Sequence, residues 1–423
     1  MRLLISGFAE TVAWSVAGLL FAAGMGLVAV RLQLSPPIFW AVVFASFLVV
    51  FGLGLSRVIC RGRRRAWGGY TFVGLAAATL AGLIFTFAFK GPTASLKSDD
   101  SLGLHFDRMP LPDGSQLAYR QYEPASDVPS PLPPIIILHG GPGVPPLKSA
   151  FDFYGRLTAS GRKVYAYEQI GVGQSSKLAR IEDYTLQRDV EDLDRFRQAI
   201  GAPKVVLVGQ SWGTILAAHY IAQHSQAVER VVFISPAAFR QDEHFRSDPG
   251  PTARADSSAA SPAPPRLFFV EMLAKLAPGA ALMLGRQEEI GHDYDLLWAD
   301  SAFADILSCR GTQPGPETLE RANGANYFAL MMTLRSMVQA KDPVGVLKTM
   351  KLPVLLLRGE CDFQPAAIIE DYRSIFSNAQ EKTIEGAGHA VVETQPAASA
   401  KAILQFMAET LIAPVDSAQG TVK

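Results

Sequence analysis

A serine set between two glycines is the first feature of this chain that could do chemistry. Residues 205–215 read VVLVGQSWGTI, so an apolar run ends at Gly209 and helix-favouring residues follow Ser211 at once. The segment fits the pattern G-x-S-x-G between a strand and a helix, a sharp corner that exposes the serine hydroxyl. An ordinary strand-to-helix turn is the alternative interpretation. Because both flanking segments match the required context, we interpret Ser211 as a nucleophile.

A serine hydroxyl is a poor nucleophile unless a base and an orienting acid assist it. His389 lies in EGAGHAVVE, just after one strand-like run, and Asp362 lies in LLLRGECDF, just after the preceding run. Chain order Ser, Asp, His is the order such a site uses. We predict that Ser211 attacks, His389 takes and returns the proton, and Asp362 orients the imidazole. Glu360 is the alternative acid, and His389 could instead be a structural loop residue. Five other histidines are interpreted as surface or packing residues: His105, His219, His224, His244 and His292.

Acyl transfer also needs hydrogen-bond donors for the oxyanion that forms on the substrate. The run HGGPG, residues 139–143, follows the strand-like run Ile135–Leu138, and its glycines leave backbone amides open to a substrate. We predict that the amides of Gly141 and Trp212, the residue after the nucleophile, form this oxyanion hole. A simple turn is the alternative interpretation of the glycine-rich run.

The elements needed to position these residues can be read from the alternation of apolar runs and helical patterns. Residues 104–124 read as two short strands joined by a Pro-Asp-Gly turn. Six strand-like runs follow: Ile135–Leu138, Val164–Tyr167, Val205–Val208, Val231–Ile234, Val354–Leu357 and Lys382–Ile384. Four helix-like segments lie between or after them: Tyr184–Ile200, Trp212–His224, Ala366–Phe376 and Ala397–Leu411. This alternation predicts an α/β fold with a mostly parallel sheet covered on both faces.

The alternation stops between about Pro236 and Leu347, which predicts a helical insertion. Its helix-like segments are Leu267–Leu276, Asp293–Leu307 and Thr318–Val338. We therefore divide the chain into a core in two parts, residues 102–235 and 348–415, and a helical cap, residues 236–347, placed over one end of the sheet.

The first 90 residues have a different character. Three uncharged apolar stretches, Thr11–Val30, Leu32–Ser56 and Ala66–Phe89, are each long enough to cross a bilayer as a helix. A signal peptide and buried core helices are the alternatives, but a signal peptide has one shorter apolar region. We predict three transmembrane helices, the second beginning near Ile38. Arginines crowd residues 57–65, so the positive-inside rule puts this loop in the cytoplasm and the catalytic domain outside it. The expected protein is a multi-pass integral membrane protein with a lipid bilayer as partner.

Composition excludes other classes of function. The chain has 423 residues with 39 basic and 39 acidic side chains, so no basic surface for a nucleic-acid partner is expected. Cys60, Cys309 and Cys361 have no zinc-site or redox spacing. We expect no metal and no cofactor. An extracytoplasmic domain would allow Cys309 and Cys361 to pair, and the sequence leaves this pairing and the oligomeric state open.

Together the motifs LHGGPG, GQSWG, RGECD and GAGH resemble the α/β-hydrolase family. The chain is most similar to proline iminopeptidases and their tripeptidyl aminopeptidase relatives, over roughly Leu102 to Leu411. The resemblance implies a helical cap after the strand ending near Ser235 and removal of an amino-terminal residue or short peptide through Ser211. The sequence differs from the family pattern at EQIGVGQS, where Glu168 replaces the family's aspartate and Ile170 replaces its arginine.

In the family, cap glutamates hold the free amino group of the substrate. The cap of this chain offers five glutamates, none of which can be matched to that role: Glu271, Glu288, Glu289, Glu317 and Glu320.

Three hypotheses about function follow. The first is a membrane-anchored aminopeptidase with proline-like specificity that cleaves short peptides. The second is an esterase or other small-acyl hydrolase on the same scaffold, since a fold does not fix its substrate. The third, a membrane interaction protein with a retired hydrolase domain, conflicts with the intact set of Ser211, Asp362 and His389.

Overall fold

The structure is a computed structural model of the whole chain. It describes residues 17, 18, 21, 45, 46, 49, 104–125, 131–239, 265–276, 278–298, 307–309 and 324–409. Residues 1–96, 180–182 and 262–294 form one unit, and the rest of the chain forms a second unit that contains the sheet.

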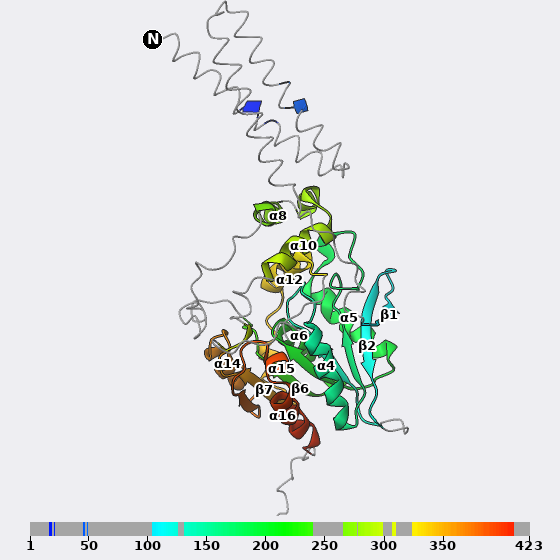
Figure 1. Cartoon of the computed structure of the whole chain (residues 1–423), viewed down its shortest axis with the longest axis vertical. Coiled ribbons are helices and arrows are strands. Elements are labelled where there is room, and N and C mark those ends of the chain that lie inside the picture. The colour runs from blue at the N-terminus through cyan, green and yellow to red at the C-terminus, as the bar shows by residue number, and fades with distance from the viewer. Residues whose placement is uncertain are drawn as a thin grey trace, which may run out of the picture. The chain divides into compact units, whose positions relative to one another are not determined.

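The described residues form a sheet of eight strands in the order β1-β2-β4-β3-β5-β6-β7-β8. The strands are β1 (Asp107–Pro110), β2 (Gln116–Tyr122), β3 (Ile135–Leu138), β4 (Val164–Tyr167), β5 (Val205–Gln210), β6 (Val228–Ile234), β7 (Val354–Gly359) and β8 (Gln380–Ile384). From β4 to β8 all neighbours are parallel, whereas β1 and β2 add an antiparallel edge. Figure 1 shows β1 and β2 at one side of the sheet and β7 with α14 at the other. All parallel strands therefore end at one edge, where ligands bind in open α/β sheets.

Helices cover both faces because the central strands are apolar on both. One face packs against α4 (Lys148–Arg156), α15 (Val391–Thr394) and α16 (Pro396–Ala408). In that layer Phe151 and Ile403 share a core with Val206 and Val208. The other face packs against α5 (Leu186–Ala199), α6 (Trp212–His224) and α14 (Ala367–Ile375), and Phe233 contacts Tyr372 there, with ring centroids 5.1 Å apart. The alternation of side chains along each strand supplies both layers.

The predicted insertion contains helices on both sides of residues 299–323, of which the structure describes only 307–309. The first unit holds α8 (Pro265–Leu276), α9 (Pro278–Ala281) and α10 (Gln287–Trp298) up to Tyr294. A buried ion pair joins two of them, since Arg266 Nε donates to Asp293 Oδ2 at 2.5 Å. The second unit holds α12 (Tyr327–Gln339) and α13 (Val344–Leu347). Short 3-10 helices complete the described elements: η3 (Leu157–Ser160), η4 (Ile181–Asp183), η5 (Ser225–Ala227) and η6 (Leu282–Leu284).

Most predicted ranges agree with the structure to within a few residues, and β3, β4 and α6 have the predicted limits. The larger differences lie in the insertion: α12 begins at Tyr327 rather than Thr318, and α10 begins at Gln287 rather than Asp293. Glu288 and Glu289 lie in its first turn, where carboxylates are stabilised by the positive end of the helix dipole. That signal favours the earlier start.

The prediction of three membrane-spanning helices is contradicted. Among the residues that the structure describes, no helix is both long and apolar enough to cross a bilayer. The longest of these helices, α5, has 14 residues, whereas a crossing takes about 20. The predicted multi-pass topology with an extracytoplasmic catalytic domain loses its basis with this finding. The predicted spans themselves, except for six isolated positions, lie outside the described residues.

Candidate active site

Ser211 lies at the corner between the end of β5 and the start of α6. Its backbone has φ 51° and ψ −118°, a conformation that costs a non-glycine residue about 1–3 kcal/mol. The two flanking glycines are required by close approach: a Cβ on Gly209 would overlap the carbonyl of Gly213, and one on Gly213 would overlap the carbonyl of Leu138. Strand and helix therefore meet closely enough to push the serine side chain out of the corner.

The structure brings the three predicted side chains together. Nε2 of His389 lies 3.0 Å from Oγ of Ser211, and Nδ1 of His389 lies 2.8 Å from Oδ1 of Asp362. His389 and Asp362 come from the loops after β8 and β7, at the same edge of the sheet as Ser211. Asp362 is 1% exposed and His389 8% exposed, so bulk water competes little for either bond.

The charge state of Asp362 determines which ring nitrogen of His389 carries the hydrogen. Burial alone raises the pKa of Asp362, but the adjacent His389 and hydrogen bonds from His389 and the Gln364 amide outweigh it, so that the pKa is lowered. An ionised carboxylate only accepts, so Nδ1 of His389 carries the hydrogen and donates it to Asp362. Nε2 of the neutral ring is then the acceptor for the Ser211 hydroxyl. This arrangement can remove the serine proton as Oγ attacks an acyl carbon.

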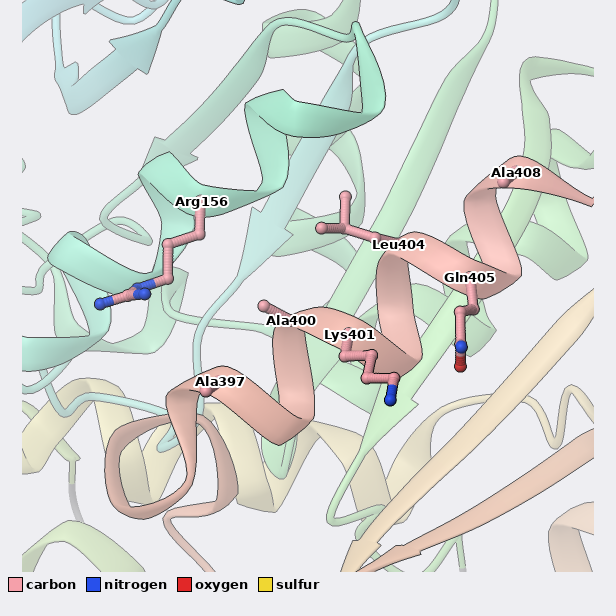
Figure 2. Close-up of a pocket in the computed structure, with 7 residues that line it drawn as sticks. All are labelled: Arg156, Ala397, Ala400, Lys401, Leu404, Gln405 and Ala408. Carbon is pink, nitrogen blue, oxygen red and sulfur yellow. The ribbon is translucent and has the colours of Figure 1, made fainter.

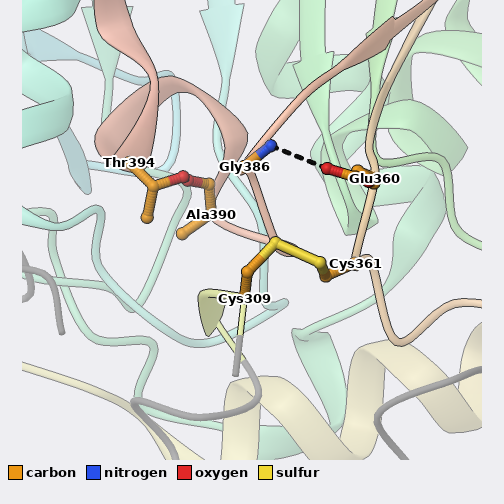
Figure 3. The surroundings of a disulfide bond; sticks show 6 residues. All are labelled: Cys309, Glu360, Cys361, Gly386, Ala390 and Thr394. Atoms are coloured by element: carbon orange, nitrogen blue, oxygen red, sulfur yellow. Dashed lines mark hydrogen bonds between the residues drawn. A yellow bond between two sulfur atoms is a disulfide. The ribbon is translucent and has the colours of Figure 1, made fainter. Parts of the chain in front are cut away.

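Glu360, the alternative acid, is placed elsewhere. Its Oε2 accepts a hydrogen bond of 3.0 Å from the backbone amide of Gly386, and its side chain is exposed (Figure 3). Glu360 holds the ends of the β7 and β8 loops together, whereas Asp362 contacts the histidine. The residue between them, Cys361, forms a disulfide with Cys309.

Residues 307–309 of the predicted cap are attached to both loops, by the disulfide to the loop of Asp362 and by backbone contacts to the loop of His389. Ser308 forms an antiparallel bridge with Ala387, and the amide of Ala390 donates to the carbonyl of Leu307 at 2.9 Å. Figure 3 shows the sulfur–sulfur bond beside these loops. The pairing that the sequence left open is therefore present in the structure.

The HGGPG loop follows β3 and lies against the nucleophile. A Cβ placed on Gly140 would come within 3.3 Å of the Ser211 Cβ, and Gly141 has φ +122°. Trp212 is the first residue of α6, so its amide is among the helix-start amides that have no acceptor within the helix. Both predicted oxyanion donors thus lie on segments next to Ser211.

Sequence reasoning assigned no role to the first residue of this loop, His139. Its ring is 2% exposed. Nδ1 donates to the carbonyl of Gly140 at 2.7 Å, and Nε2 accepts from the amide of Gln169 at 2.9 Å. Burial lowers the pKa of His139 from 6.5 to about 4. A neutral His139 therefore fixes the loop after β3 to the loop after β4.

The stability of the fold should depend on pH through His139. A group whose pKa is lower in the folded state contributes its stability above its unfolded pKa and loses it as the pH falls. The contribution is therefore complete above pH 6.5 and falls by about 3 kcal/mol towards pH 4. We expect the difference in free energy of unfolding between the wild type and His139→Gln to shrink by that amount over this interval. Chemical denaturation at a series of pH values measures it, and two parallel pH curves would refute the role of the ring.

The departures at Glu168 and Ile170 leave the turn after β4 intact. Glu168 is 1% exposed, and its Oε2 accepts from the amide of Gln174 at 2.6 Å. Its carboxylate fills the space that a side chain on Gly173 would occupy. Ile170 is buried at 3% exposure. In this chain the buried side chain of Glu168 therefore stabilises the turn by its hydrogen bond to Gln174 and by packing against Gly173.

The three cap glutamates that the structure describes are paired with basic neighbours or exposed. Glu271 pairs with Lys275 at 2.6 Å, Glu289 pairs with Arg286 at 3.0 Å, and Glu288 is exposed. Glu317 and Glu320 lie outside the described residues.

Two other features of the described part of the chain lie apart from the triad side chains: a group of possible metal ligands and a shallow hollow. The group of side chains close enough to share a metal ion is Cys309, Glu360 and Cys361, but the disulfide occupies both sulfurs. A shallow hollow lies between the end of α4 and α16 (Figure 2) and contains none of the predicted site residues. Its lining is mostly apolar: Arg156, Ala397, Ala400, Lys401, Leu404, Gln405 and Ala408.

Known proteins are similar to this chain in sequence and in fold. The family model described as alpha/beta hydrolase fold matches residues 133–396. A proline iminopeptidase of Lactobacillus delbrueckii subsp. bulgaricus is 26% identical over 278 residues, which cover 60% of this chain and 83% of that protein. A proline iminopeptidase of Heyndrickxia coagulans is 39% identical over 104 residues, 24% of this chain and 35% of that protein. A solved esterase of Exiguobacterium antarcticum has a TM-score of 0.51 at 15% identity and covers 72% of this chain and 100% of that one, a likeness of fold alone.

Proposed function

The chain belongs to the α/β-hydrolase family, and from this premise we propose that it is a serine hydrolase acting through Ser211, His389 and Asp362. His389 removes the hydroxyl proton as Oγ of Ser211 attacks the acyl carbon of the substrate. It then gives that proton to the leaving group, which departs and leaves the acyl group on the serine. In the second half of the reaction His389 takes a proton from water, the water oxygen attacks the acyl carbon, and the proton returns to Oγ of Ser211 as the acid product leaves. The contacts of 3.0 Å and 2.8 Å along this chain of side chains are the observation that carries the proposal.

The tetrahedral oxyanion is stabilised by the amides of Gly141 and Trp212. Gly141 follows Gly140, which lies against Ser211, and Trp212 directly follows Ser211. Such donors act where negative charge develops, and the loss of one typically costs about 3 kcal/mol of transition-state stabilisation.

The proposed substrates are short peptides or arylamides with a free amino-terminal residue, with proline-like residues preferred. Two observations support this class: the motifs HGGPG and GQSWG, and the curated relatives named proline iminopeptidase. The alternative, an esterase for small acyl groups, is favoured by one observation. The described cap glutamates Glu271 and Glu289 each pair with a basic neighbour, Lys275 and Arg286, rather than presenting an unpaired carboxylate for a substrate ammonium group.

The two classes are separated by the substrate's amino group. We expect prolyl-p-nitroanilide to be cleaved about 100- to 1000-fold faster than its N-acetylated form, because an aminopeptidase needs a carboxylate that binds the substrate's ammonium group, and a buried charge left without its partner costs about 3–5 kcal/mol. Initial rates on both amides and on p-nitrophenyl acetate measure this, with Ser211→Ala as the control. Equal rates on the two amides, or hydrolysis of the ester alone, would reject the aminopeptidase and leave the esterase.

A further inference from the structure

Asn326 directly precedes α12, and its side chain is completely buried, with 0% exposure. It caps the helix: Oδ1 accepts hydrogen bonds of 3.1 Å from the amides of Phe328 and Ala329. Capping explains the side-chain oxygen, but aspartate and serine cap as well as asparagine does. The side-chain nitrogen must therefore serve another purpose.

That nitrogen reaches a different part of the core. Nδ2 of Asn326 donates to the carbonyl of Gly171 at 3.2 Å and to Oη of Tyr184 at 3.1 Å. The Tyr184 hydroxyl also accepts from the amide of Leu178 at 2.7 Å. A side-chain amide has two donors and two acceptor positions, and here all four are used. Aspartate lacks the donors and glutamine is longer, so only asparagine satisfies this set of partners.

The backbone of Asn326 holds the HGGPG loop. Its amide donates to the carbonyl of Gly143 at 2.7 Å. Gly143 has φ +74°, and a Cβ at this position would overlap the Asn326 carbonyl and the backbone of Leu330. Two residues before Asn326, the carbonyl of Gly324 accepts a hydrogen bond of 2.8 Å from the amide of Gly173. The loop after β3 and the turn after β4 are thus both docked on residues 324–326.

We propose that Asn326 is a positioning residue for the oxyanion loop, residues 139–143, and so for the amide of Gly141. This inference rests on the proposed function. Gly143 is two residues from Gly141, and Gly140 lies against Ser211. An oxyanion donor is effective only within about 2.7–3.1 Å of the developing charge. A shift of the Gly143 carbonyl away from Asn326 therefore moves the Gly141 donor out of the range in which it stabilises the transition state.

Asn326→Asp and Asn326→Ser test the proposal because both keep an oxygen that caps α12 and remove the Nδ2 donors. With p-nitrophenyl acetate and prolyl-p-nitroanilide as probes, we expect kcat to fall about 10- to 100-fold while KM changes less than about twofold, since the lost stabilisation belongs to the transition state. Inhibition by phenylboronic acid provides a second readout, because its adduct on the serine places an oxygen where the oxyanion forms. Its inhibition constant should rise by the factor by which kcat/KM falls.

Arg230→Met is the matched control for lost stability. Arg230 is 3% exposed and donates to the carbonyls of Phe406 and Glu409 at the end of α16. This variant should lower Tm at least as much as the Asn326 variants while kcat stays at the wild-type value. The proposal is overturned if the Asn326 variants retain kcat within about threefold of wild type, or if Arg230→Met loses as much.

Failure of the inference can be told apart from failure of the proposed function. If the wild type turns over the probes through Ser211 and the Asn326 variants match it, only the positioning role is wrong. If the wild type shows no turnover that depends on Ser211, the proposed function fails and the positioning role fails with it.

Discussion

Ser211→Ala and His389→Ala should each lower kcat by about a million-fold while the protein keeps its fold. The reason is the continuous hydrogen-bonded path from Oγ of Ser211 through the ring of His389. Without the hydroxyl there is no nucleophile, and without the imidazole the hydroxyl stays protonated at neutral pH. Steady-state rates on the substrate that the wild type cleaves fastest measure both losses.

The double variant gives the sharper test. A triad acts as one unit, so Ser211→Ala with His389→Ala should be little worse than either single variant. Thermal unfolding of all three proteins serves as the control for the fold. Losses that multiply, or full activity in either single variant, would contradict the assignment of these residues to one mechanism.

The parts of this site that could be predicted from sequence are those with a local signature. Ser211 was predicted because Gly209 and Gly213, two residues before and after it, allow the strand and the helix to approach closely. His389 and Asp362 were found because parallel strands end at one edge of the sheet, which ties together loops far apart in the chain. The family resemblance stated from the motifs is confirmed by the matching family model and the proline iminopeptidase relatives.

The parts that could not be predicted depend on pairings without a local signature. Asn326 contacts Gly171 across 155 residues and Tyr184 across 142 residues, and an asparagine before a helix has the same local pattern whether or not its nitrogen is used. The role of His139 depends in the same way on Gln169, in the loop of a neighbouring strand. The disulfide between Cys309 and Cys361 required the folded loops to bring the two residues together.

The apolar stretches in the first 90 residues illustrate a different limit. Hydropathy and length alone predicted membrane spans there, and the described helices do not support them. Where helical patterns alternate with strands, as in residues 184–224, a second constraint applies, because each predicted helix must also pack on the sheet. That constraint is why the core was predicted more accurately than the amino-terminal region.

Asp362→Asn should lower kcat by about ten-thousand-fold, the size of loss seen when the acid of a serine protease triad becomes an amide. The asparagine amide can donate to Nδ1 of His389, which leaves the ring hydrogen on Nε2. In that tautomer Nε2 faces Oγ of Ser211 as a donor, so it cannot accept the serine proton. KM should change little, because the loss concerns proton transfer rather than binding.

The matched control is Glu360→Gln, two residues away on the same loop. Glu360 is exposed and bonds to the amide of Gly386 rather than to the histidine, so this variant should retain kcat within about threefold of wild type while losing a surface contact. The two variants together decide which carboxylate orients His389. The disulfide at Cys361 and the hydrogen bond of 2.9 Å from its amide to the carbonyl of Ala387 hold the backbone between them, so each substitution should change one side chain without moving the other. A larger loss in Glu360→Gln than in Asp362→Asn would reverse the assignment, and equal small losses would remove the acid from the mechanism.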